Sequence, residues 1–181
     1  MTLLSAAQSL LLIVDIQDRL LPAMQDGEAV VRNSAILLQA SGKLGIPALL
    51  TEQYRKGLGG TVAAVAEVAA GAPVCEKMHF SAYADPAIRG RIEQFGRKRI
   101  VIAGIEAHVC VLQTALDLIA GDYDVFVVAD AIASRRRENV ELARQRLGMA
   151  GVALVSTEMC LFEWLETASH AQFKALSQLI K

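Results

Sequence analysis

Residues 101–118, VIAGIEAHVCVLQTALDL, pass from an apolar run through a short turn into a helical pattern. The β-branched start is typical of a buried strand, and the apolar spacing after Cys110 is typical of a helix ending at Gly121. A strand followed by a helix is the repeating unit of a parallel α/β sheet. The cysteine where the helix begins is either a small apolar core group or a nucleophile.

Apolar runs of the same kind recur along the 181 residues, with helical patterns between them. Strands are expected at residues 9–15, 47–51, 74–77, 99–103, 124–129 and 152–156. They are apolar throughout rather than alternating, which predicts burial on both faces. We find no repeat or linker, so we expect one domain over residues 1–181, an open parallel sheet with helices on both faces.

The composition limits the expected partners. The chain is 54% hydrophobic, but no apolar run reaches the ~18 residues that cross a membrane, so no membrane partner is expected. The apolar excess instead predicts a buried sheet and a homo-oligomer, a dimer or larger. The net charge is −1, and we interpret the short basic runs GRKRI and SRRREN as solvated loop charge rather than a nucleic-acid site.

The start of the sequence and the cysteines predict the compartment. MTLLSAAQSL lacks the features of a signal peptide. Three cysteines, an odd number without close pairs, suit a reducing environment. We therefore expect a cytoplasmic protein.

Three reactive residue types meet at one edge of the predicted sheet. Asp15 ends the first strand, Lys77 ends the third, and Cys110 follows the fourth. Ligands of such sheets bind outside the carboxyl ends of the strands. A helix N-terminus and a nearby ammonium would favour the Cys110 thiolate, and a carboxylate could carry its proton. Each residue also has a structural interpretation: a loop cap, a solvated lysine and a packed thiol.

The chain resembles the isochorismatase-like cysteine hydrolases. The resemblance covers nearly the whole chain and rests on three ordered motifs, LLIVDIQ, EKMHFSAY and VIAGIEAHVCVLQTALD, followed by VFVVADAIASR. It implies a Rossmann-like three-layer α/β/α sandwich with a central parallel sheet of about six strands. Within the family, TEQYRKGLG is similar to the isochorismatase domain-containing proteins.

The resemblance also implies residue roles. Cys110 matches the nucleophile, Asp15 the general acid and base, and Lys77 the lysine that orients the aspartate and lowers the thiol pKa. It implies a cis peptide between Ile105 and Glu106, with the backbone N–H groups of Glu106 and Cys110 forming an oxyanion hole.

The chain departs from the family's nicotinamidases, which bind a metal through an aspartate and histidines after the second strand. The sequence there is LLTEQYRKGLGGT, without histidine, so no metal and no cofactor are expected.

A second set of residues surrounds these motifs: Gln17, Glu52, Tyr54, His79 and Phe80 are candidates for binding a small-molecule substrate. For Gln17 a loop hydrogen bond, and for Glu52 loop capping, are the alternatives. We interpret His108 as a solvated turn residue. Burial is expected for four further residues: inert thiols at Cys75 and Cys160, and a core or subunit-interface position for Phe162 and Trp164.

Two functions of different classes fit these features. The first is a metal-independent cysteine hydrolase acting on a small amide or related acyl compound through a thioester. The second is a non-catalytic binding or scaffold protein on the same fold. A dinucleotide-binding protein is disfavoured because LIVDIQDRL has no glycine-rich turn after the first strand.

Overall fold

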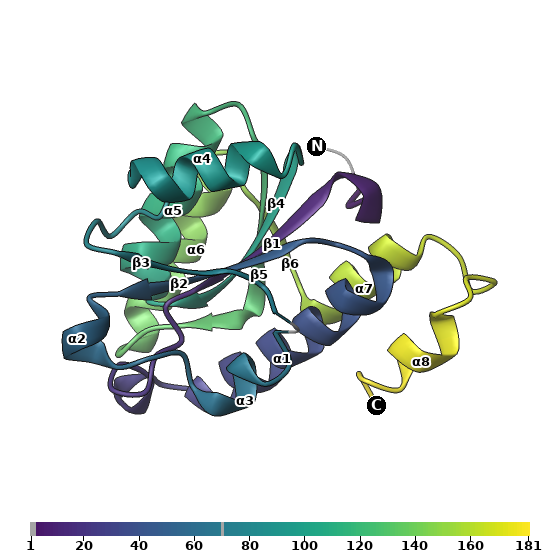
Figure 1. Cartoon of the computed structure of the whole chain (residues 1–181), viewed down its shortest axis with the longest axis horizontal. Helices are drawn as coiled ribbons and strands as arrows, with labels where there is room; N and C mark the ends of the chain where they lie inside the picture. Colours follow the sequence, from purple (N-terminus) through teal and green to yellow (C-terminus); the bar gives the residue numbers. More distant parts are fainter. Residues whose placement is uncertain (1–2, 70) are drawn as a thin grey trace.

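Six parallel strands form one sheet, in the order β3-β2-β1-β4-β5-β6, in this computed structural model (Figure 1). The structure describes residues 3–69 and 71–181. The strands are β1 (Ser9–Val14), β2 (Ala48–Gln53), β3 (Val74–Lys77), β4 (Arg99–Ile105), β5 (Asp124–Ala133) and β6 (Ala153–Val155). Every neighbouring pair is parallel, which confirms the predicted sheet.

Helices cover both faces of the sheet. The helices are α1 (Gly27–Leu44), α2 (Arg55–Leu58), α3 (Ala63–Ala66), α4 (Pro86–Gln94), α5 (Leu112–Ala120), α6 (Arg137–Met149), α7 (Thr157–Leu165) and α8 (Phe173–Ser177). Two 3-10 turns span Ala6–Gln8 and Leu21–Ala23. In Figure 1, α1, α3 and α7 lie on one side of the sheet, and α4, α5 and α6 lie on the other. This arrangement is the predicted three-layer sandwich.

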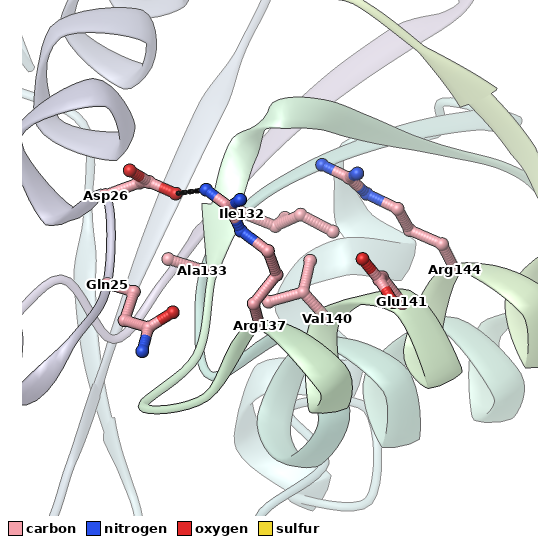
Figure 2. Close-up of a pocket in the computed structure, with 8 residues that line it drawn as sticks. All are labelled: Gln25, Asp26, Ile132, Ala133, Arg137, Val140, Glu141 and Arg144. Carbon is pink, nitrogen blue, oxygen red and sulfur yellow. Dashed lines mark ion pairs between the residues drawn. The ribbon is translucent and has the colours of Figure 1, made fainter.

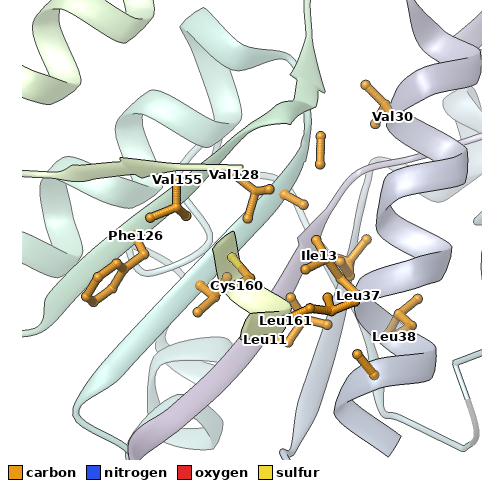
Figure 3. Close-up of a cluster of buried hydrophobic side chains, with 14 of the residues drawn as sticks. Leu11, Ile13, Val30, Leu37, Leu38, Phe126, Val128, Val155, Cys160 and Leu161 are labelled. Carbon is orange, nitrogen blue, oxygen red and sulfur yellow. The ribbon is translucent and has the colours of Figure 1, made fainter. Parts of the chain in front are cut away.

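The central strands β1 and β4 are mostly apolar because both of their faces are buried. Leu11 and Ile13 of β1 pack in the cluster that contains α1 and α7 (Figure 3). Leu10 and Leu12 pack in the opposite cluster with α4, α5 and α6. Because successive strand residues face opposite sides, one apolar run supplies both cores. Two separate apolar layers therefore hold the sheet in place.

The third strand departs from the prediction. β3 is an edge strand, where Val74 is 47% exposed and Cys75 is half-buried. The expected burial of β3 on both faces, and of the Cys75 thiol, is therefore wrong, since an edge strand has a neighbour on one side only. Cys160 and Trp164 are buried as expected, whereas Phe162 is 41% exposed.

The segment before α5 is also irregular. The expected helix start at Cys110 is a π-helical turn, Ala107–Val111, and α5 begins after it at Leu112. Such turns are rare and are frequent at functional sites. Within residues 3–69 and 71–181, none of the helices has both the length and the apolarity to traverse a bilayer.

Candidate active site

The close approach of β1 and β4 brings the site together. Val14 lies in register with Gly104, where the backbone has φ +124°. A Cβ at this glycine would lie 2.0 Å from the Val14 carbonyl oxygen, so only glycine fits. The residues that follow the two strands, Asp15 and Glu106, therefore leave the sheet side by side.

Asp15 and Lys77 form a buried ion pair at this edge. Lys77 Nζ lies 2.6 Å from Asp15 Oδ2, and both side chains are 0% exposed. Asp15 has a left-handed backbone, φ +52°, which is uncommon outside glycine. The Thr51 hydroxyl donates to the second carboxylate oxygen, Oδ1, at 2.8 Å. Both oxygens of Asp15 are thus held in place by neighbouring strands.

Lys77 has further acceptors. Gln53 Oε1 accepts from Nζ at 2.8 Å, and the carbonyls of Phe80 and His79 lie at 3.1 and 3.3 Å. Buried charges are tolerated when they are paired and hydrogen-bonded. These contacts explain how a lysine with 1% exposure is accommodated in the interior.

Cys110 joins this pair from the π-helical turn. Its thiol lies close enough to Asp15 for that carboxylate to raise the thiol pKa, whereas the Glu106 backbone lowers it. Burial, followed by the nearby Asp15 charge, raises the pKa of Cys110 to about 12, although Lys77 acts in the opposite direction. Lys77 lowers the thiol pKa as expected, but the net shift is upward. The Asp15 charge and the loss of hydration outweigh the ammonium.

The peptide that carries the Glu106 N–H is non-proline and cis, as the family resemblance implied. The Glu106 carboxylate accepts from the backbone N–H and Nε of Arg135, at 3.3 and 3.1 Å. This contact ties the end of β4 to the loop after β5. The predicted oxyanion hole at the N–H groups of Glu106 and Cys110 remains a prediction.

Two of the candidate substrate-binding residues are occupied by loop contacts. Gln17 donates to the carbonyls of Gln53 and Gly59 and accepts from the Gln53 backbone N–H. Glu52 accepts from Thr61 and Arg55. Their side chains perform the loop roles that the sequence left as alternatives.

The other three candidates lie near the surface. Tyr54 is 45% exposed and Phe80 is 54% exposed, so neither is a core residue. His79 lies 4.0 Å from Asp85, and its side chain is also largely exposed. These three remain predicted substrate contacts at the rim of the site.

Sequence reasoning was wrong about His108 and missed the role of Thr51. His108 is half-buried rather than solvated, with Nδ1 2.9 Å from Ser134 Oγ and Nε2 3.3 Å from Asn139 Nδ2. Thr51 could have been found from its place at the end of a strand neighbouring Asp15. Among the described residues, no three His, Cys, Asp or Glu side chains are grouped as metal ligands.

A cavity of about 370 Å³ lies at the carboxyl end of β5 against α6 (Figure 2). Its lining residues are Gln25, Asp26, Ile132, Ala133, Arg137, Val140, Glu141 and Arg144. Arg137 pairs with Asp26 at 3.6 Å on one side of the cavity. Ile132 packs in the same apolar cluster as Cys110. The Asp15–Lys77 ion pair and the Cys110 thiol, however, are not among the residues that line this cavity.

Comparison with known sequences identifies related proteins. The family model for the isochorismatase domain matches residues 9–159. The chain is 35% identical over 178 residues to isochorismatase domain-containing protein 1 of Danio rerio. The match covers 98% of this chain and 62% of that protein, so this chain spans less than two thirds of the relative's length.

Two solved structures share the fold. A protein described as MAR1 ribonuclease from Caenorhabditis elegans has a TM-score of 0.93 and 32% identity, covering 99% of this chain and 92% of that chain. The YcaC gene product of Escherichia coli, described as an octameric hydrolase of unknown specificity, also has a TM-score of 0.93. It is 24% identical, over 99% of this chain and 90% of that chain.

Proposed function

Because this chain belongs to the isochorismatase family of hydrolases, we propose that it is a metal-independent cysteine hydrolase acting on a small amide or related acyl compound. One observation carries the proposal. The Cys110 thiol lies beside a carboxylate, Asp15, whose charge acts on it, and Asp15 is itself held by a buried ammonium, Lys77. A nucleophile, a proton acceptor and a cation in contact are the groups that acyl transfer requires.

The proposed reaction has two halves. Cys110 Sγ attacks the carbonyl carbon while its proton passes to Asp15. The C–N bond then breaks, and the amine leaves with that proton, so a thioester remains. Water gives a proton to Asp15 and attacks the thioester. The C–S bond breaks, the sulfur recovers the proton, and the acid leaves.

The resting thiol fits this scheme. A pKa raised to about 12 keeps Cys110 neutral until a substrate arrives. Proton transfer to the adjacent Asp15 then makes the thiolate only during attack, which avoids a lasting buried charge beside the carboxylate. The N–H groups of Glu106 and Cys110 would stabilise the developing oxyanion.

Thiol labelling tests the proposal without a known substrate. Limiting iodoacetamide would be applied from about pH 5 to 9, and the rates at Cys75, Cys110 and Cys160 compared by mass spectrometry. A thiol without a base labels about tenfold faster per pH unit below its pKa, because the reactive species is the thiolate. We expect that slope at Cys75. At Cys110 we expect a nearly flat profile, since Asp15 takes the proton.

A substrate screen with a nucleophile variant completes the test. Small amides would be assayed for ammonia release, with an RNA oligonucleotide included because one structural relative is described as a ribonuclease. Cys110→Ala should lose at least about a thousandfold in rate, while Cys75→Ala keeps its activity. An unreactive Cys110 with no turnover would favour the alternative, a non-catalytic binding protein.

The remaining expectations are proposals on the same basis. We keep a small molecule as the partner and the cytoplasm as the compartment, the latter because all three cysteines are free. A homo-oligomer is supported by the relative described as octameric. No metal, cofactor or nucleic acid is assigned.

A further inference from the structure

The ammonium of Lys77 has one charged acceptor among its four hydrogen-bond acceptors. Asp15 Oδ2 lies at 2.6 Å, and the others are the Gln53 amide oxygen and two backbone carbonyls. A lysine ammonium has three N–H donors. The two shortest contacts, to Asp15 and Gln53, therefore fix its position between the first and second strands.

The Gln53 side chain can face Lys77 in one orientation only. Its Nε2 donates to the Met78 carbonyl at 2.9 Å, so its oxygen must be the atom turned towards the ammonium. Gln53 and Lys77 are partners in the β2–β3 register, so their side chains leave the sheet on the same face.

The Gln53 backbone is clamped as well. Gln17 Oε1 accepts from the Gln53 N–H at 2.7 Å, and Gln17 Nε2 donates to the Gln53 carbonyl at 3.0 Å. Gln17 is 0% exposed and Gln53 is 9% exposed. A chain of buried contacts thus runs from Gln17 through Gln53 to Lys77.

Other charged side chains nearby are directed elsewhere. Glu76 accepts from the backbone N–H of Arg55, and Glu52 accepts from the Arg55 guanidinium. His79 faces Asp85. In the part of the chain that the structure describes, the ionisable groups left near Lys77 are therefore Asp15 and the Cys110 thiol.

We propose that Gln53 is a positioning residue for the reaction: its neutral amide fixes the Lys77 ammonium and leaves Asp15 as the only charged partner of Lys77 within residues 3–69 and 71–181. The inference rests on the proposed function. Its two parts are separable, because a glutamate at this position would keep an acceptor but add a charge, and a methionine would keep the volume but remove the acceptor.

Gln53→Glu tests the neutrality. The Asp15 charge already raises the Cys110 pKa and the Lys77 charge lowers it, so a second carboxylate paired with Lys77 should raise that pKa further. A rise of about one pKa unit should slow Cys110 labelling about tenfold across the measured pH range. Gln94→Glu, an exposed change of equal charge on α4, should leave the Cys110 labelling rate unchanged.

Gln53→Met tests the positioning. We expect Cys110 labelling to slow several-fold in the wild-type background and to be unaffected by the same change in a Lys77→Met background, because coupled residues are not additive. An equal slowing in both backgrounds would assign Gln53 a merely structural role. This pair of variants also replaces Gln53→Glu if that protein does not fold.

The outcomes separate the two proposals. A wild-type Cys110 that does not label would overturn the hydrolase function and this inference with it. A reactive wild-type Cys110 whose labelling rate is unchanged in Gln53→Glu would overturn the inference alone.

Discussion

At the residue scale, the Thr51 hydroxyl decides how firmly Asp15 is held. Thr51→Val removes the 2.8 Å hydrogen bond to Asp15 Oδ1 inside the core. We expect the free energy of unfolding, measured with urea, to fall by about 1.5–3 kcal/mol, the range for hydrogen bonds to charged groups. Cys110 labelling should also slow, since Asp15 loses one of the groups that hold its carboxylate in place beside the thiol.

Two variants control this prediction. Thr51→Ser restores the hydroxyl and should recover the labelling profile. Thr157→Val removes a similar bond, 2.9 Å long, to Asp130 in another part of the fold. It should lower stability without moving the profile. Equal profiles for Thr51→Val and wild type would mean that the hydroxyl does not act on Asp15.

The sequence predicts individual residues unevenly. Asp15, Lys77 and Cys110 could be placed together because strand ends share an edge. Contacts within that edge could not, because they depend on rotamers and register. Gln17 looked like a substrate contact, yet its amide holds a loop. The raised pKa of Cys110 was missed because burial and the Asp15 charge outweigh Lys77.

At the element scale, apolar runs located all six strands, but edges and irregular ends were harder to predict. β3 is short and carries Glu76 and Lys77, which fits the edge position that the sheet order gives it. β5 extends to Ala133, beyond the predicted end, and its register with β4 shifts between Ile102 and Gly104. The π-helical turn around Cys110 has no sequence pattern distinct from an α-helix.

Gly104 on β4 tests the strand packing that builds the site. Gly104→Ala places a Cβ 2.0 Å from the Val14 carbonyl at a positive φ. We expect the free energy of unfolding to fall by at least about 3 kcal/mol, from strain and overpacking. Gly90→Ala within α4 meets open space and should instead gain about 0.5–1 kcal/mol. Similar urea midpoints for the two variants would contradict this account.

At the scale of the whole molecule, two apolar layers each enclose a thiol. Cys110 belongs to the layer under α4, α5 and α6, and Cys160 to the layer under α1 and α7. Burial is the first cause that raises the pKa of each. The folded protein therefore binds these protons more tightly than the unfolded chain does, so alkaline pH must lower its stability.

The sign of this effect gives the last prediction. The Cys110 pKa is raised from 9.0 to about 12, so its contribution to stability is present below pH 9 and is lost as pH rises towards 12. Between about pH 8 and 10, ionisation of the unfolded chain should cost about 1.4 kcal/mol per buried thiol. Measured with urea over this pH range, the free energy of unfolding should therefore fall more in wild type than in Cys110→Ala, by about that amount.

Cys75→Ala is the control, because it removes a thiol that is only half-buried. Its free energy of unfolding should fall by nearly as much as that of wild type. Equal falls in wild type and Cys110→Ala would mean that folding leaves the Cys110 pKa unshifted. A smaller fall in wild type than in Cys110→Ala would mean that Cys110 is already a thiolate when folded, and Asp15 would then have no proton to accept.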